Sequence, residues 1–594
     1  MAWRVDPATG PERLEALTVD RLKPIARLVA SSPPTRKADL VALIWGKLTD
    51  PRFLRSYWDH HLDEIERNAV REAVYHDGQL DTRVLQAKYG RTVRTRSSGY
   101  SYSERETTPP LAPFFLLSMS IPAEVVALLR EFVPEPEPFV LSGVKEAPET
   151  FQPKRGEPVP LQRADTEQAA IHDLLAVLEL AREGKVAVGE KTGAPSAATL
   201  RALGSRLLLP EYSLELEERK PEDSIRAFGL VVEAPAGGLA RVSGGRLRLT
   251  RAGEVFLREP SAARLRDAFG RWLTADAPDE LRRIRSVKGQ QGRRTDLTPP
   301  SERKAAIADA LRRCPIGEWI AIPDFLRAIV AWHLLFTVED GEYSGLYVGW
   351  SAEYGTLDAD AYLALVQGQY ALVVLWEHMA GFGALDVLYV SPEDAEYPVD
   401  APYFDESYFS RYDGLKHFRI NALGAYLLER TDAYDGPAVS ERPPAFTVLA
   451  NLDVAVTDPR QFAPNDRAFL ERVAAPHGEG VYRLDRERIL AAAEDGIAVD
   501  TVEEFLSTRG ARAVPDPVSR FLADLRANTQ AFQPPVRALL IRCRDEYVRD
   551  LLVHDTVLGK LCAPTGAESL TVAERDEAAF RRRLRKLGYA VPPR

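Results

Sequence analysis

Apolar residues recur along the chain mainly at the spacing of amphipathic helices, with short alternating stretches between them. One example is a set of four apolar residues at i, i+3, i+4, i+7 spacing between Ile171 and Leu178. Residues 246–249 instead alternate with period two, as a strand does. The pattern predicts a mainly α chain with α+β modules, and 594 residues are more than one domain core holds.

The first 50 residues predict two short helices, over 17–28 and 35–44, with Thr35 as the cap of the second. The pair resembles a SAP motif, which binds duplex DNA through the basic start of its second helix. The resemblance implies that Arg36 and Lys37 contact DNA. A plain helical hairpin is the alternative, because two-helix patterns are common.

Residues 51–133 predict a winged-helix-like unit. A helix over 62–76 precedes a break at Gly78, a helix over 81–89 and an arginine-bearing hairpin over 90–99. A cation at such a wing can meet the DNA backbone. The candidates for phosphate contact are Lys88, Arg91, Arg94 and Arg96.

Another winged-helix-like unit is predicted over residues 161–275, after a proline-rich linker over 134–160. Its hairpin signal is Gly244-Gly245 between two short strands. The alternation places Arg246 and Arg248 on one face, so the expected wing has a basic outer side.

An internal repeat extends this pattern. Residues 247–257 recur as 418–428 at an offset of 171, and both read as strand, cap, glycine and apolar helix. The period is far longer than that of a solenoid. Residues 276–443 are therefore predicted to hold a basic connector and a further winged-helix-like unit with an acidic aromatic insertion. Winged helices bind proteins as well as DNA, so both roles stay open.

The pattern changes after residue 443. A strand, turn and strand over 446–456, a helix capped by Asp485 and two later helices define a unit over 444–530. The last segment, 531–594, reads as β-α-β-α and predicts a small α/β domain.

The formal net charge of -10 is distributed unevenly. Fifteen acidic residues and one basic residue lie between Ala331 and Asp413, so this window carries -14 and the rest of the chain +4. An acidic, aromatic surface suits a protein partner. We predict docking of a partner by Tyr343, Tyr347, Trp350 and Tyr354. A solvated face over an aromatic core is the equal alternative.

Two basic runs contrast with this window. Residues 281–304 contain eight Lys or Arg against two acids, and residues 580–594 contain six and no acid. Both runs are candidates for phosphate contact, with Arg283 and Lys288 singled out in the first. A solvated helix face is the commoner reason for such a run.

Residues 446–456, 482–485, 505–506 and Pro515 resemble the XPB-type helicase N-terminal domain of bacterial helicase-associated proteins. Residues 279–285, 288–290, 301–304 and 317–325 resemble the middle of the same proteins. The likeness follows most of the chain in order, with Asp485 where Ser or Thr is more usual. It implies contact with DNA and the placing of a helicase motor on it.

Catalytic signatures are absent from the sequence. It has no P-loop, no HExxH and no GxSxG, and its three cysteines form no CxxC. His60 and His61 are adjacent and point apart on a helix, which argues against a metal pair. We therefore predict no enzyme, metal or cofactor. No membrane-length apolar run or signal peptide occurs, which favours a cytoplasmic protein without membrane contact.

The leading hypothesis is a non-enzymatic accessory protein that binds DNA without sequence specificity, beside a separate XPB-like helicase or other motor, in repair or a related pathway. The alternative is a protein-interaction scaffold or transcription-associated adaptor whose winged helices contact only proteins. Salt-dependent DNA affinity separates the two. A nuclease in the acidic window is a third hypothesis, which metal-dependent DNA cleavage would reveal.

Overall fold

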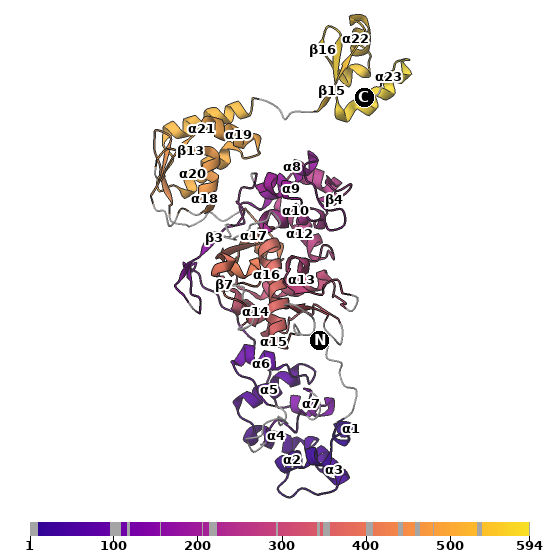
Figure 1. The fold of residues 1–594 in the computed structure, drawn as a ribbon, viewed down its shortest axis with the longest axis vertical. Helices are drawn as coiled ribbons and strands as arrows, with labels where there is room; N and C mark the ends of the chain where they lie inside the picture. Colours follow the sequence, from indigo (N-terminus) through magenta and orange to yellow (C-terminus); the bar gives the residue numbers. More distant parts are fainter. Residues whose placement is uncertain are drawn as a thin grey trace.

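The chain is mainly helical with small antiparallel sheets, and the computed structural model assigns 48% of it to helix and 14% to strand. Figure 1 shows the N-terminal helices, a central body and two smaller α/β units in succession. The structure describes residues 10–94, 108–115, 119–154, 156–204, 206–212, 223–292, 295–340, 345–348, 357–399, 408–436, 444–457, 462, 464–478, 480–531 and 537–592. Within these ranges, none of the helices combines the length and apolar character that a bilayer span needs.

In the part of the chain that the structure describes, the N-terminal unit consists of seven helices. One core runs from Leu14 to Val133, so the expected domains 1–50 and 51–133 are packed together. The residue that caps α3 is Arg36, without a side-chain hydrogen bond, so the prediction of Thr35 as the cap is wrong. The helices are α1 (Gly10–Glu15), α2 (Val19–Val29), α3 (Lys37–Leu48), α4 (Pro51–His61), α5 (Glu64–Tyr75), α6 (Thr82–Tyr89) and α7 (Ala123–Arg130).

The expected wing over residues 90–99 is described only as far as residue 94, and those residues form no strand. Helix α6 ends at Tyr89 and is capped by Gly90, whose positive φ of 69° suits a residue without a Cβ. The β-pairing described in this unit is a single bridge between Gln79 and Ser120. Helices α5 and α6 follow the predicted order of helix, turn and helix, and residues 95–99 of the predicted hairpin lie outside the described residues.

The proline-rich segment 134–160 is attached to the central body and is more than a linker. Trp332 donates its indole N–H to the carbonyl of Phe139 at 2.9 Å, and Val144 forms a β-bridge with Trp319. The segment also contains the two-stranded pair β1 (Thr150–Phe151) and β2 (Val159–Pro160).

The central body has one hydrophobic core, which runs from Leu141 to Leu428 and so includes both expected units, 161–275 and 276–443. Its first half contains α8 (Ala170–Arg182), α9 (Ala197–Gly204), α10 (Arg226–Ala236), β4 (Ala240–Val242), β5 (Leu247–Leu249), α11 (Arg251–Arg258) and α12 (Ala262–Leu273). A connector follows, with η2 (Glu280–Arg283) and β6 (Val287–Lys288), which pairs with β8 (Tyr347–Val348).

The second half of the body has a similar order of elements, with an additional strand, β7, between its first two helices, and a larger sheet. Strand β3 (Gln162–Ala164) joins the sheet at one edge, in the order β3-β9-β10-β7. The elements are α13 (Pro300–Arg313), β7 (Trp319–Ala321), α14 (Ile322–Ala331), a long helix made of α15 (Ala359–Tyr362), η3 (Leu363–Gly368), α16 (Gln369–Val373) and η4 (Val374–Met379), then β9 (Leu385–Tyr389), η5 (Pro392–Asp394), η6 (Arg411–Gly414), β10 (Leu415–Ile420) and α17 (Ala422–Leu427).

The internal repeat of the sequence is a repeat of local structure. The Thr250 hydroxyl accepts from the backbone N–H of Gly253 at 3.2 Å, and the Asn421 side chain accepts from that of Gly424 at 2.8 Å. Both caps therefore begin a helix directly after a strand, as the repeat predicts.

One carboxyl group near β3, that of Glu167, makes the stability of the central body depend on pH. Burial raises the pKa of Glu167 to about 7, although a hydrogen bond from Tyr434 at 3.0 Å opposes the rise. Folding therefore favours the protonated acid, and this stabilisation is lost as pH rises from the unfolded value near 4.5 through about 7.

We predict that Glu167→Gln will reduce the fall in melting temperature between pH 5 and pH 8, because glutamine keeps the acceptor but does not titrate. Thermal unfolding followed by circular dichroism at several pH values measures this. Tyr434→Phe is the matched variant: loss of its hydroxyl raises the pKa of Glu167 further and moves the transition to higher pH. The same pH profile in all three proteins would contradict the assignment.

Two α/β units follow the body. In the first, a core separate from that of the body packs a sheet of order β11-β12-β14-β13 against helices, and Asp485 caps α19 as predicted. Helix α18 and strand β13 were not predicted. The elements are β11 (Phe446–Val448), β12 (Asp453–Val456), α18 (Pro464–Val473), β13 (Ala474–Pro476), β14 (Val481–Leu484), α19 (Arg486–Glu494), α20 (Val499–Arg509) and α21 (Asp516–Thr529).

The C-terminal unit has a small core and a three-stranded antiparallel sheet of order β15-β17-β16. The predicted β-α-β-α order lacks one of these strands, β16. Its elements are β15 (Ala538–Arg542), α22 (Glu546–Val553), η7 (Leu558–Lys560), β16 (Cys562–Gly566), β17 (Ser569–Ala573), η8 (Glu574–Asp576) and α23 (Glu577–Lys586).

Candidate nucleic-acid interface

The hairpin of β4 and β5 carries three exposed arginines. Its turn contains Gly244 and Gly245, both with positive φ, at 61° and 68°, a conformation that glycine adopts without a steric penalty. The pairing register places Arg241 directly opposite Arg248, and Arg246 lies just before β5. All three side chains are exposed, as the alternation predicts for Arg246 and Arg248, while Leu247 is fully buried on the opposite face.

Two like charges directly opposite each other destabilise a strand pair. In the described part of the chain, neither Arg241 nor Arg248 has an ion-pair partner that offsets this repulsion. A multivalent anion bound across the pair would remove it, because each guanidinium could donate to an anionic oxygen. The hairpin is therefore a candidate site for phosphate groups.

The hairpin is fixed to the body by its backbone. Leu247 donates its N–H to the carbonyl of Val186 at 3.0 Å, and Val188 donates to Gly245 at 2.9 Å. The Glu190 carboxylate accepts from the N–H of Gly245, and the Arg246 guanidinium donates to the carbonyl of Gly184. The arginines are thus presented on a framework that the fold holds in place.

The helix before each strand pair of the body is inaccessible to DNA. Helix α10 is buried along nearly its whole length and packs against η4. The contact is so close that a Cβ on Gly229 would overlap the carbonyl of Glu377. Neither helix can enter a major groove while the body is folded, so sequence readout by these helices is excluded.

Buried ion pairs join the elements at this contact, and they account for part of the first basic run. Arg283 was predicted to contact DNA, but it bonds the carboxylate of Glu377 at 2.8 Å and the carbonyl of Ser224 at 2.7 Å. Its guanidinium also lies 3.5 Å from the ring centre of Phe228. The prediction for Arg283 is therefore wrong in placement, because the side chain is internal.

Two more cations of that run are internal as well. Arg303 pairs with Asp279 at 2.8 Å, and Lys304 pairs with Glu280 at 3.2 Å. Lys288 remains exposed on β6, where it lies opposite the half-buried Tyr347. Of the six cations of this run that the structure describes, Arg283, Arg303 and Lys304 are thus internal, and Arg282, Arg285 and Lys288 are exposed.

The N-terminal candidates divide in the same way. Arg36 and Lys37 are exposed at the start of α3, and Arg91 and Arg94 are exposed after α6. Lys88 has a nearly buried side chain that pairs with Glu72 at 2.6 Å, so it is not the surface cation that the sequence predicts. Arg96 lies outside the described residues.

In the described part of the acidic aromatic window the aromatic side chains are buried or half-buried, whereas five of the acids are exposed: Asp340, Asp358, Asp360, Glu393 and Asp394. Tyr370 and Trp376 are fully buried, which supports the alternative of an aromatic core for this part. Among its acids, Glu377 and Asp386 are buried and paired with arginines, and Asp413 accepts from the N–H of Ser410 at 2.9 Å. Tyr343, Trp350 and Tyr354 lie outside the described residues, and their docking role stays a prediction.

In the C-terminal basic run, two of the arginines are paired within their own unit. Arg581 bonds Glu577 and Arg583 bonds Asp555, each at 2.7 Å. Arg582, Arg585 and Lys586 are exposed on α23. Arg594 lies outside the described residues.

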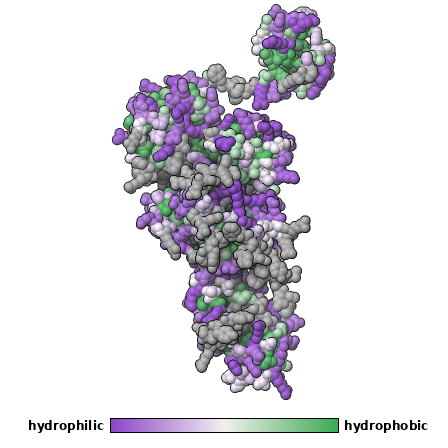
Figure 2. Space-filling model, in the orientation of Figure 1, coloured by the Kyte–Doolittle hydropathy of each residue, from purple (hydrophilic) through white to green (hydrophobic). Residues whose placement is uncertain are grey.

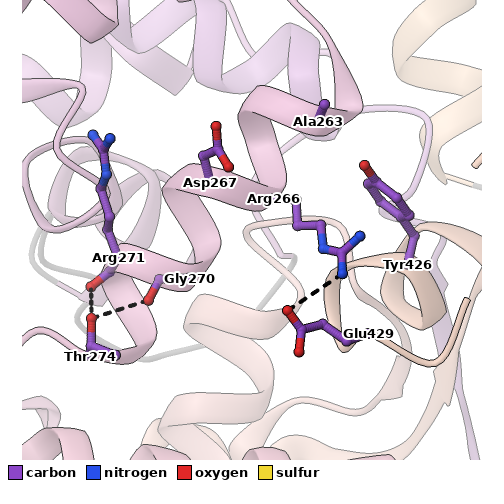
Figure 3. A pocket seen from close by; sticks show the side chains of 8 residues that line it. All are labelled: Ala263, Arg266, Asp267, Gly270, Arg271, Thr274, Tyr426 and Glu429. Carbon is purple, nitrogen blue, oxygen red and sulfur yellow. Dashed lines mark hydrogen bonds and ion pairs between the residues drawn. The ribbon is translucent and has the colours of Figure 1, made fainter. Parts of the chain in front are cut away.

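A groove of about 510 Å³ lies between α12 and α17. Figure 3 shows Arg266 reaching toward Glu429 beside the ring of Tyr426, and the ion pair measures 3.4 Å. Its lining balances two arginines with two acids, Asp267 and Glu429, so it has no net charge for phosphate. Its other arginine, Arg271, lies against Gly238 at the start of the hairpin.

Sequence reasoning singled out Arg246 and Arg248 but missed Arg241 as their partner. The signal was present, because a two-glycine turn between residues 243 and 246 fixes which residues face each other.

Comparisons with known proteins do not identify a family for this chain. No family model matches it, and no curated protein is significantly similar to it.

Proposed function

We propose that the chain is a non-enzymatic, DNA-binding accessory protein that holds the phosphate backbone through the β4-β5 hairpin. The observation that carries the proposal is the exposed pair Arg241 and Arg248, with Arg246 beside it and, among the described residues, no acid paired with either member. Phosphate contact of this kind supplies affinity and position without sequence information.

The order of elements in the body supports winged-helix-like units. Each half runs helix, strand-like segment, helix, helix and two-stranded pair, and the second half has the sheet order β7, β10, β9 expected of that architecture. In the arrangement we propose, the third helices, α10 and the helix ending in η4, pack together. The hairpin then contacts DNA without base recognition. A separate XPB-like helicase or other motor is the partner that the family resemblance implies.

The test is a titration of labelled single-stranded, duplex and forked DNA at several salt concentrations, followed by fluorescence anisotropy. We predict that Arg241→Ala/Arg248→Ala will weaken binding at least about tenfold at low salt. The same variant will lower the salt slope by about one for each phosphate that the protein no longer neutralises. The fold should be unharmed or slightly more stable, because the substitutions remove a like-charge pair.

The matched control is Arg512→Ala/Arg520→Ala, which removes the same charge from exposed positions of the 444–530 unit. It should bind nearly as the unchanged protein does. Equal weakening in both variants would mean that only overall charge matters, and no binding of any DNA at low salt would overturn the proposal.

A protein-only adaptor is the second candidate, and one feature of the C-terminal unit favours it. Leu540 and Tyr547 are 59% and 74% exposed beside a groove of about 720 Å³ that Arg542 and Arg581 also line. Figure 2 shows apolar residues at the surface of this unit. An exposed apolar groove is typical of protein contact. Salt-insensitive or absent DNA binding would favour this candidate.

A further inference from the structure

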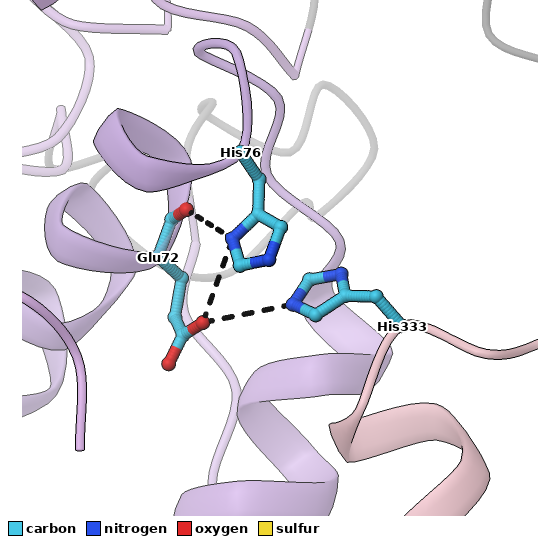
Figure 4. Close-up of side chains that lie close together, drawn as sticks. All are labelled: Glu72, His76 and His333. Atoms are coloured by element: carbon cyan, nitrogen blue, oxygen red, sulfur yellow. Dashed lines mark hydrogen bonds and ion pairs between the residues drawn. The ribbon is translucent and has the colours of Figure 1, made fainter. Parts of the chain in front are cut away.

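Three residues that are far apart in the sequence converge where the N-terminal unit meets the central body. Glu72 and His76 lie at the end of α5, and His333 lies in the turn after α14. One ligand atom from each lies within 4.8 Å of the other two. Figure 4 shows the three side chains turned toward one another, with the two imidazoles face to face. Their ring centres are 3.5 Å apart.

The carboxylate of Glu72 has one occupied oxygen and one that accepts no hydrogen bond. Oε1 receives the hydroxyl of Tyr89 at 2.7 Å and the ammonium of Lys88 at 2.6 Å. Oε2 is buried without a hydrogen bond, and the nearest imidazole nitrogens are 3.7 Å away on His333 and 3.9 Å away on His76. A buried, unsatisfied carboxylate oxygen costs free energy unless something binds it.

One of the two histidines, His76, has the supporting hydrogen bond that is typical of a metal ligand. Nδ1 of His76 is 2.9 Å from the backbone carbonyl of Glu72. The same Nδ1 is the His76 nitrogen that lies 3.9 Å from Oε2. A proton on Nδ1 would be donated to the carbonyl, so a cation would be bound through Nε2, which is the usual second-shell pattern of metal-bound histidine. His333 has a φ of 57°, rare for a residue with a Cβ, and such backbone strain gathers at functional sites.

We propose that Glu72, His76 and His333 bind a divalent transition metal, Zn²⁺ being the best fit, and that the metal joins the N-terminal unit to the central body. Two imidazoles and one carboxylate are a common zinc donor set, with a water as the fourth ligand. Bonds of about 2.0–2.2 Å would place the ligand atoms about 3.3 Å from one another, so atoms that now lie up to 4.8 Å apart would move closer by up to about 1.5 Å as the side chains rotate.

The two units already touch beside this cluster. Arg327 of α14 donates to the carbonyl of Ala87 in α6 at 2.6 Å, and Val84 and Ala87 pack against Val330 and Ala331. A metal would add a bond of fixed geometry to this small apolar contact. Lys88 opposes metal binding, because its ammonium is paired with the same carboxylate, that of Glu72. The proposal does not depend on DNA binding.

The experiment titrates chelator-treated full-length protein with Zn²⁺ against a chromophoric chelator, and records the visible absorption of a Co²⁺-loaded sample. We expect one metal per chain and a tetrahedral Co²⁺ spectrum. His333→Asn should lose the spectrum and at least about tenfold in affinity. Asparagine tolerates a positive φ, so this variant should keep its fold.

Two further variants make the result specific. Lys88→Met should bind Zn²⁺ roughly tenfold more tightly, because it removes a positive charge from beside the site. His60→Ala changes an exposed histidine of α4 and should leave binding unchanged. No bound metal, or unchanged binding in His333→Asn, would overturn the proposal. Loss of binding in His60→Ala alone would also overturn it, because the metal would then lie elsewhere.

Discussion

Replacing Arg283 with alanine is expected to lower the free energy of unfolding of the central body by about 3–5 kcal/mol, the usual result of removing one partner of a buried ion pair. The side chain of Glu377 is 1% exposed, and Arg283 is its ion-pair partner at 2.8 Å. Without the guanidinium, the carboxylate keeps the hydroxyl of Tyr412 but loses its countercharge.

The loss of stability should grow with pH. Burial raises the pKa of Glu377 above its ordinary value even though Arg283 opposes the rise. In the variant, the opposing charge is gone, so the acid will bind a proton more readily and the folded state will be least harmed where that proton is available. Urea unfolding followed by tryptophan fluorescence at pH 5.5 and pH 8 measures both effects, since Trp272 and Trp376 lie in this core.

Arg285→Ala is the matched control. Its guanidinium is 56% exposed and lies 3.8 Å from Asp223, so we expect a change of at most about 0.5–1 kcal/mol. A double variant, Arg283→Met/Glu377→Met, should recover part of the stability because it leaves no bare charge. Equal stability of Arg283→Ala and Arg285→Ala would contradict the role assigned to the internal pair.

The second large effect is expected at the glycines of the internal repeat. A Cβ on Gly253 would overlap the carbonyl oxygen of Leu239, and one on Gly424 would overlap that of Ala384. In both places the helix start lies directly on the residue before a strand, and the overlapping atom is backbone, which cannot rotate away. We predict that Gly253→Ala or Gly424→Ala will each destabilise the body by about 1–3 kcal/mol, the range of an overpacked core.

Gly270→Ala in α12 is the control for both. Nothing lies within 4 Å of the Cβ that it would add, and alanine is the better helix former, so the variant should be up to about 1 kcal/mol more stable. Thermal unfolding of the three variants side by side tests the comparison. A destabilised Gly270→Ala, or a neutral Gly424→Ala, would show that the close approach is not what fixes these positions.

The sequence predicted local structure better than long-range contact. The repeat of strand, cap, glycine and helix is confirmed at Thr250 and Asn421, because a cap and its helix depend on residues three apart. Asp485 is confirmed as a cap for the same reason. Strand β16 was missed because its outward positions, including Pro564 and Gly566, lack an alternating apolar pattern.

The candidate site was predicted only in part for a related reason. Arg246 and Arg248 are exposed because period-two alternation is a local property. The sequence predicts Arg283 and Lys88 as surface cations, because their acidic partners lie 94 and 16 residues away in the chain and only the folded contact brings them together. The same holds for His76 and His333, which no spacing rule connects.

Because α10 packs against η4, we expect neither half of the body to fold alone, although each half contains one copy of the sequence repeat. A fragment ending near residue 275 would expose to water the apolar face of α10 that packs on η4, and would leave Gly229 without its neighbour Glu377. Such a fragment should aggregate or stay unfolded, while residues 134–436 should fold together. The repeated unit and the folding unit of this chain therefore have different boundaries, and a fragment made to test function has to contain both halves of the body.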